Sequence, residues 1–279
     1  MRNLKLGVRG RTYNGCGVAR YQNMFADGFR FCDLSLGDME EGIYEYEEPQ
    51  FIARILEERA LAEEAGIRFF QLHGPTRYPP RDATEEERAE QKVRMEKCFR
   101  AAKLLNCPYV VQHPLMPFGT KEDPDPEAVI QINVEFFRSL LPAARENGVT
   151  ICLENMPMSK LSISYPESIL RVVKEIDDPN FAFCLDTGHS IVKGVQPADA
   201  VRAAGSILMV LHVHDSDGER DRHWFPGEGA IDWADFSAAL QEIGYQGVMN
   251  LETGPDSELP LEQYRQECRR LVTIGRSLV

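Results

Sequence analysis

The chain has 279 residues, of which 43% are hydrophobic, and it carries a formal net charge of −13 at neutral pH. This composition is typical of a globular protein and excludes a disordered chain. Because no run of about 18 apolar residues occurs, we expect no membrane-spanning helix. The negative charge argues against broad, nonspecific attraction to nucleic acid.

The start of the chain and its cysteines indicate a cytoplasmic protein. Residues 1–7 lack the long apolar core of a secretory signal peptide. The cysteines are odd in number, show no paired metal-binding spacing and lie in several cases inside apolar segments, as thiols do in a reducing cytosol. They are Cys16, Cys32, Cys98, Cys107, Cys152, Cys184 and Cys268.

Short apolar segments alternate with longer segments of helical period along the chain. We predict strands over residues 4–9, 29–36, 67–73, 109–113, 150–154, 181–186, 208–214 and 247–252. The clearest helical patterns cover residues 51–65, 84–105, 126–147, 166–175, 233–243 and 261–277. Eight strands that each lead toward a helix predict an α/β fold, a single (β/α)8 TIM barrel that covers residues 1–279 as one domain.

Ionisable side chains stand at the carboxyl ends of six of these strands. Because all strands of such a barrel point their carboxyl ends to one mouth, we expect these groups to lie close together there. They are His73, His113, Glu154, Asp186, His214 and Glu252.

The alternation of side chains along a strand places these groups in layers. Cys152 shares a face with Glu154, and Cys184 shares a face with Asp186, so inward thiols would lie in the core and the carboxylates at the mouth. Several carboxylates packed together are costly unless protons or cations offset their charge. Histidine and carboxylate ligands suit zinc, manganese or iron, so the sequence predicts a divalent metal site.

Two further polar residues are expected one layer below the predicted metal ligands, and we do not interpret them as ligands. His212 precedes His214 by two positions, and Asn250 precedes Glu252 by two. We interpret both as structural groups that support the ligands, because inward side chains at these positions would lie below the mouth.

Long segments after two strands, residues 75–83 and 216–231, are expected to cover the mouth. In the second, Asp221 and His223 are spaced to reach one ion, and Arg220 and Arg222 are candidate contacts to an anion or a hydroxyl group. Trp224 could stack on a sugar ring or base, or pack beneath the loop.

These residues resemble the xylose isomerase-like TIM-barrel superfamily, which contains sugar isomerases, epimerases and the endonuclease IV type of apurinic endonuclease. The epimerase likeness implies that Glu154, Asp186, His214 and Glu252 hold the metal and that Glu154 and Glu252 also move the substrate proton. It implies substrate contacts for His189 and Arg220. One departure is Lys160, where those enzymes often carry a glutamate.

The endonuclease likeness implies a three-zinc site. Its ligand positions would fall on His73, His113, Glu154, Asp186, His189, His214, Asp221, His223 and Glu252. The segment 7–10 departs from that family's opening His-Val-Ser, and the acidic segment 37–42 stands where a DNA-contacting loop would be. Acidic side chains there would repel a phosphate backbone.

The leading hypothesis is an isomerase or epimerase of a small sugar or sugar-like polyol that depends on zinc or manganese, with one to three ions. Proton transfer through an enediolate would fall on Glu154 and Glu252. A multinuclear zinc phosphoesterase and a non-catalytic sugar- or metal-binding barrel are the alternatives, and the resemblance allows a homo-oligomer. Expected substrate contacts are His73, His113, His189, Arg220 and Trp224.

Overall fold

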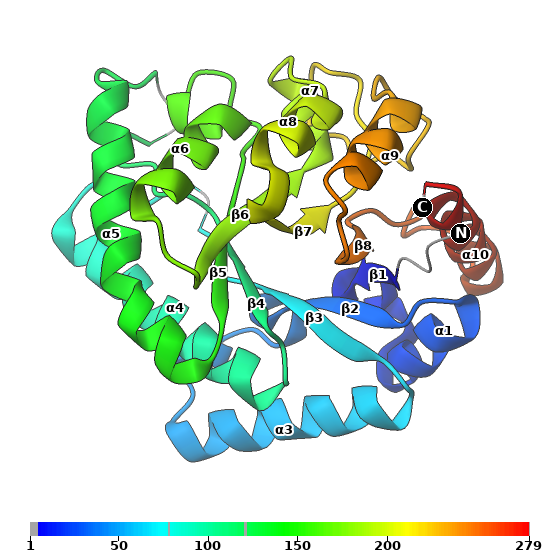
Figure 1. The fold of residues 1–279 in the computed structure, drawn as a ribbon. Coiled ribbons are helices and arrows are strands. Elements are labelled where there is room, and N and C mark those ends of the chain that lie inside the picture. The colour runs from blue at the N-terminus through cyan, green and yellow to red at the C-terminus, as the bar shows by residue number, and fades with distance from the viewer. Residues whose placement is uncertain (1–4, 78, 120–121, 279) are drawn as a thin grey trace.

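Eight parallel strands form the centre of the molecule, and helices surround them (Figure 1). The computed structural model describes residues 5–77, 79–119 and 122–278. The strands are β1 (Lys5–Arg9), β2 (Phe31–Ser35), β3 (Arg68–His73), β4 (Tyr109–Gln112), β5 (Thr150–Glu154), β6 (Phe181–Asp186), β7 (Leu208–His212) and β8 (Val248–Leu251).

The strands follow one another around a barrel in chain order, and β1 pairs with β8. The seam between β7 and β8 is closed by a single bridge between Val213 and Leu251. The amide of Val213 donates to the carbonyl of Asn250 at 2.9 Å, and the amide of Glu252 donates back to Val213 at 3.0 Å. The predicted (β/α)8 TIM barrel is therefore confirmed.

The helices pack outside the strands (Figure 1). Some that the sequence pattern did not predict are short, such as α1, α2, α7 and α8, because so few turns give little periodicity. The helices are α1 (Arg20–Asp27), α2 (Leu36–Met39), α3 (Glu48–Glu64), α4 (Glu85–Leu104), α5 (Pro126–Asn147), α6 (Pro166–Ile176), α7 (Thr187–Val192), α8 (Pro197–Ala204), α9 (Trp233–Glu242) and α10 (Leu261–Ser277). Short 3₁₀ segments lie at Gly10–Ala19, Ile43–Glu45, Ser162–Ser164 and Gly205–Ile207.

Two apolar layers hold the barrel together. The large layer lies between strands and helices, and a small inner cluster fills the barrel below the mouth. Cys152 and Cys184 belong to the inner cluster, so the predicted inward layer of thiols is present. All seven cysteines are free. No helix in the described part of the chain is long and apolar enough to cross a membrane.

Strand β7 ends two residues earlier than the sequence pattern predicted. It stops at His212, and the chain passes through the Val213 bridge before it reaches His214. His212 therefore occupies the last position of the strand, and His214 belongs to the loop that follows. This difference decides which histidine joins the carboxylates at the mouth.

A buried carboxylate joins the first helix of the ring to the last. Asp27 at the end of α1 has a side chain only 1% exposed. It accepts hydrogen bonds from Arg265 at 2.8 Å and Arg269 at 3.2 Å, both on α10, and from the hydroxyl of Tyr13 at 3.1 Å. The ends of the chain are thus tied by a polar network as well as by apolar contacts.

Replacing this carboxylate should destabilise the barrel. Because Asp27→Ala removes the acceptor of Tyr13 and Arg265 and one acceptor of Arg269, we expect a loss of about 2 kcal/mol in the free energy of unfolding. Urea denaturation measures it. The matched control is Glu262→Ala, which removes an exposed partner of Arg269 and should cost under about 0.5 kcal/mol. Equal losses would contradict a special role for Asp27.

Candidate metal centre and active site

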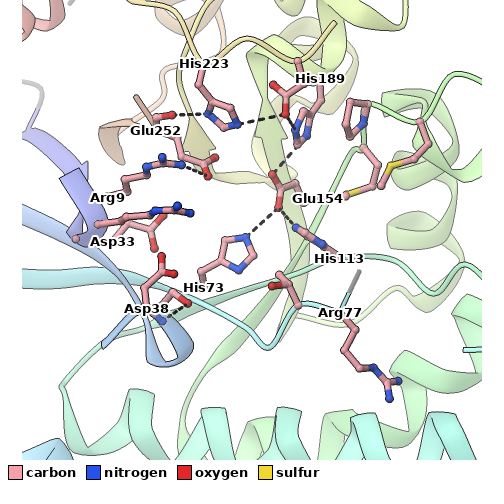
Figure 2. A pocket seen from close by; sticks show the side chains of 18 of the residues that line it. Arg9, Asp33, Asp38, His73, Arg77, His113, Glu154, His189, His223 and Glu252 are labelled. Carbon is pink, nitrogen blue, oxygen red and sulfur yellow. Dashed lines mark hydrogen bonds and ion pairs between the residues drawn. The ribbon is translucent and has the colours of Figure 1, made fainter. Parts of the chain in front are cut away.

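The carboxyl ends of the strands surround a cavity of about 360 Å³. Four of the chain's six histidines line it, namely His73, His113, His189 and His223. The other two, His212 and His214, are fully buried beside it. Figure 2 shows the lining side chains from β3, β4, β5 and β8 turned toward one another across this space.

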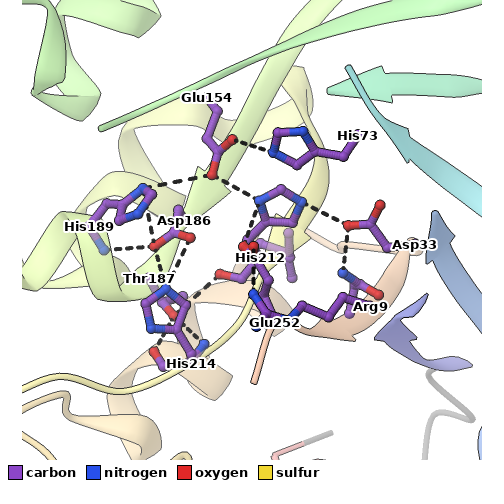
Figure 3. Close-up of polar contacts among 12 residues, drawn as sticks. Arg9, Asp33, His73, Glu154, Asp186, Thr187, His189, His212, His214 and Glu252 are labelled. Atoms are coloured by element: carbon purple, nitrogen blue, oxygen red, sulfur yellow. Dashed lines mark hydrogen bonds and ion pairs between the residues drawn. The ribbon is translucent and has the colours of Figure 1, made fainter. Parts of the chain in front are cut away.

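One group of ligand-type side chains combines three carboxylates with a histidine. Glu154, Asp186, His212 and Glu252 each offer an atom within 4.8 Å of those of the others. The Nδ1 atom of His212 lies 2.8 Å from Glu154 Oε1 and 3.0 Å from Glu252 Oε2 (Figure 3). The four residues come from the ends of four consecutive strands, so the barrel itself sets their spacing.

A second group adjoins the first. His189, His214, Asp221 and His223 also offer atoms within 4.8 Å of one another. Asp221 Oδ2 lies 3.3 Å from His189 Nε2 and 3.2 Å from His223 Nε2. Asp186 connects the groups, because its Oδ1 lies 3.0 Å from His214 Nε2.

The structure corrects the expected placement of the two histidines after β7. His214 was predicted to join Glu154, Asp186 and Glu252 as a ligand, and His212 was interpreted as a support. The geometry puts His212 among the carboxylates because β7 ends there and turns its side chain into the barrel. The amide of His214 instead donates to Thr187 Oγ1 at 3.0 Å, which draws this residue toward α7.

Gly188 has no side chain and therefore leaves room for the ring of His214. A Cβ atom at Gly188, the second residue of α7, would lie 1.9 Å from His214 Cε1. Asp186 caps the same helix by accepting a hydrogen bond from the amide of His189 at 2.6 Å. The start of α7 therefore fixes Asp186, His189 and His214 together.

Glu154 also faces two further histidines. Its Oε2 atom lies 3.3 Å from His113 Nε2 and 3.6 Å from His73 Nε2. The same oxygen is buried and accepts no hydrogen bond from any described residue. A buried carboxylate oxygen with no hydrogen-bond donor, surrounded by imidazole nitrogens, fits a ligand of a divalent metal.

The loop between β7 and α9 is anchored by a buried carboxylate. Asp215 accepts hydrogen bonds from the amide of Gly227 at 2.9 Å and from the indole of Trp233 at 2.8 Å. It also pairs through its backbone with Trp224. These bonds hold the segment that carries Asp221 and His223. The ring of His223 contacts the carbonyl of Glu252 at 2.7 Å through Nδ1.

Charges in the site shift several ionisations. Burial would raise the pKa of Glu154, but His212 and the contacts with His113 and His73 hold it well below its usual value. Burial would also raise the pKa of Glu252, but the charge of His212 outweighs burial and lowers this pKa. Both groups are thus carboxylates near neutral pH.

The histidines respond in the opposite sense. Burial would lower the pKa of His73, but Glu154 outweighs it and raises the pKa to about 9. Asp186 and Asp221 likewise outweigh burial and raise the pKa of His189 to about 10, and Asp221 raises that of His223 to about 9. At His113 burial prevails over the contact with Glu154, and the pKa is lowered.

Two predicted substrate contacts lie elsewhere. Arg220 and Trp224 are in the expected loop but are not among the described residues that line the cavity. Trp224 is 37% exposed, with the guanidinium of Arg222 5.5 Å from its ring centroid. The backbone carbonyl of Arg220 is held by the hydroxyl of Ser216. Anchoring by Asp215 directs Asp221 and His223, rather than these two side chains, to the cavity.

Other lining residues were not singled out from the sequence. Arg9 at the end of β1 contacts Glu252 at 3.5 Å, and Asp33 on β2 contacts His212 at 2.9 Å. A charged residue inside the apolar segment Phe31–Ser35 was the available signal for Asp33. Further lining residues are Ser35, Asp38, Arg77, Met116, Met156 and Met158.

Comparison with known proteins places this site in a family. Residues 24–274 match the family described as xylose isomerase-like TIM barrel, and the chain belongs to it. This confirms the family that the sequence resemblance indicated.

Two curated relatives and one solved structure illustrate the likeness. The inosose isomerase of Bacillus subtilis is 29% identical over 170 residues, 58% of this chain and 58% of that protein. The D-psicose 3-epimerase of Ruminiclostridium cellulolyticum is 34% identical over 121 residues, 43% of this chain and 40% of that protein. The chain thus spans about half the length of the curated relatives it matches. The IOLI protein, solved with a zinc atom, shares the fold with a TM-score of 0.76 over 99% of this chain and 96% of its own, at 20% identity.

The shifted histidines predict how the metal-free protein responds to pH. Because the pKa values of His73, His189 and His223 are raised to about 9 or 10, their protonated forms stabilise the fold fully below about pH 6.5. This contribution is lost as the pH rises through 9 to 10. The unfolding midpoint of chelator-treated protein should therefore fall between pH 6.5 and 10.

The metal-loaded protein is the control for this experiment, because a bound cation offsets the carboxylate charge that raises these histidine pKa values, while cysteines and tyrosines titrate in both forms. The gap between the two midpoints should widen with pH. A constant gap would show that these histidines carry no such charge.

Proposed function

We propose that this protein is a metal-dependent isomerase or epimerase of a small sugar or sugar-like polyol. One observation carries the proposal: Glu154 from β5 and Glu252 after β8 both contact the Nδ1 atom of His212 (Figure 3). Both also line the cavity (Figure 2). Two ionised carboxylates close together at a small cavity suit the removal and return of a proton.

The residues that would hold the metal are Glu154, Asp186, His212 and Glu252. Two buried carboxylates, Glu154 and Asp186, with the partly buried Glu252 beside them, need positive charge nearby. A histidine with carboxylates suits zinc or manganese. When bound, the metal supplies Lewis acidity that makes a hydrogen beside a carbonyl group more acidic. The second group could hold further ions, and we assign Asp221, His189, His214 and His223 to it.

The carboxylates would do the proton chemistry. Since both pKa values are held low, either Glu154 or Glu252 can accept a proton from a carbon beside a carbonyl group. Return to the neighbouring carbon gives an isomer, and return to the opposite face gives an epimer. His73, His113 and His189 line the cavity and would contact hydroxyl groups.

The size of the cavity supports a substrate of one sugar or cyclitol ring. A volume of about 360 Å³ lies at the low end for small-molecule sites. The relatives named above are an inosose isomerase and a D-psicose 3-epimerase, and these names support a carbohydrate substrate. A carbohydrate ligand, rather than a nucleic acid, also suits the net charge of −13.

Glu252→Gln tests the proton-transfer role. The protein, loaded with zinc or manganese, is incubated in D₂O with a panel of ketoses and inososes, and loss of carbon-bound hydrogen is followed by NMR. We expect exchange by the unchanged protein and a loss of 10²- to 10⁴-fold in Glu252→Gln, because the amide cannot accept the proton.

Glu258→Gln is the matched control, because it makes the same change at an exposed position six residues further on. Metal content is measured for each variant, so that loss of the base is separated from loss of the metal. Full exchange by metal-loaded Glu252→Gln would refute the role. Absence of exchange on every sugar by the unchanged protein would favour a non-catalytic binding barrel.

A second candidate function is a multinuclear zinc phosphoesterase. The observation that favours it is the second group, which adjoins the first through Asp186 and, with His73 and His113, supplies more ligand atoms than one ion requires. Multiple zinc ions could activate water and stabilise a phosphoryl transition state.

Metal content distinguishes the two functions. Protein purified without chelator or added metal is analysed for ions per chain. About one ion is expected for the isomerase or epimerase, with His73 and His113 left for the substrate. About three zinc ions would favour the phosphoesterase, and cleavage of a duplex that contains an abasic site, abolished in Glu154→Ala, would then establish it.

A further inference from the structure

A buried carboxylate lies directly behind the proposed metal ligands. Asp33 on β2 is 4% exposed, and its Oδ2 atom accepts three hydrogen bonds. Figure 3 shows the one from His212. The donors are Gln71 Nε2 at 3.0 Å, Asn250 Nδ2 at 3.1 Å and His212 Nε2 at 2.9 Å. They come from β3, β8 and β7, so the oxygen is fixed by three strands besides its own.

The hydrogen bonds to Asp33 require that Nε2 of His212 carries a hydrogen. An amide NH₂ group can only donate, so Gln71 and Asn250 require Asp33 Oδ2 to be an acceptor. Nε2 of His212 must then donate to the same oxygen. Nδ1 faces the carboxylates of Glu154 and Glu252, so it also carries a hydrogen in the metal-free protein, and it is the nitrogen whose hydrogen a cation there would replace.

We propose that Asp33 is a positioning residue that holds His212 with hydrogen on Nε2, so that Nδ1 is the metal-binding atom. The inference rests on the metal centre of the proposed function and adds a residue to it. Gln71 and Asn250 act through Asp33: they hold the carboxylate against His212 without touching the ligand carboxylates. Asp33 also places a negative charge behind the ring, which strengthens its bond to a cation.

The Asp33→Ala variant removes this support. Zinc affinity is measured by competition with a chromophoric chelator, and we expect it to fall about 100-fold, the upper end for loss of such a partner. In Asp33→Asn an oxygen can still accept from His212 but the charge is gone, so we expect a fall of about tenfold. Asp27→Ala, which removes another buried and hydrogen-bonded carboxylate but one outside the cavity lining, is the control and should bind zinc as the unchanged protein does.

A second readout reports on the ring itself. In ¹⁵N-labelled, zinc-loaded protein, long-range proton–nitrogen spectra should show His212 with hydrogen on Nε2. Zinc on Nδ1 itself keeps hydrogen on Nε2, so the reporter is the hydrogen bond of that Nε2–H group to residue 33. The Nε2–H resonance should shift upfield and exchange faster with water in zinc-loaded Asp33→Ala, whereas Asp33→Asn should keep it protected. A purely structural role would lower the unfolding midpoint of Asp33→Ala and leave both zinc affinity and the ring spectrum unchanged.

The outcomes separate this inference from the proposed function. Unchanged zinc affinity in folded Asp33→Ala overturns the inference while the metal centre stands. If that variant does not fold, unchanged affinity in Asp33→Asn overturns it. No zinc binding by the unchanged protein overturns both. Zinc binding that depends on Asp33, without sugar proton exchange, supports the inference and removes only the isomerase or epimerase activity.

Discussion

The concentration of negative charge at the barrel mouth is the constraint on which the rest of the site depends. Glu154 and Asp186 are almost completely buried, and Glu252 is close to them. Such carboxylates cannot lie together without positive charge or hydrogen-bond donors. Six histidines lie around these carboxylates, and the raised pKa values of His73, His189 and His223 are the direct result. The same balance makes the site receptive to a divalent cation.

The sequence predicted the barrel because its apolar segments recur at regular intervals and because each strand is long enough to show its pattern. It also predicted that Glu154, Asp186 and Glu252 would converge, since strand ends meet at one mouth whatever the details of the loops. The short helices α7 and α8 were missed because local pattern is weak over so few residues. Yet α7 is the element whose first turn orders Asp186, His189 and His214.

The roles of His212 and His214 show where prediction from sequence stops. Both belong to one alternating face, and the pattern His-Val-His does not say at which residue the strand ends. The answer depends on the bridge between Val213 and Leu251, which joins segments distant in the chain. Asp33 was overlooked for a similar reason: its importance comes from partners on three other strands, none of which is near it in sequence.

The Val213 bridge affects how firmly the barrel is closed. It is the one bridge that closes the described barrel between β7 and β8, and the residues on either side of it, His212 and Glu252, belong to the same ligand group. A cation held by both would span this seam and act as a cross-link where the hydrogen-bond ladder is thinnest. Closure of the barrel between β7 and β8 and binding of the cation would then stabilise each other. The part of the fold with the weakest backbone pairing would be the part that the ligand braces.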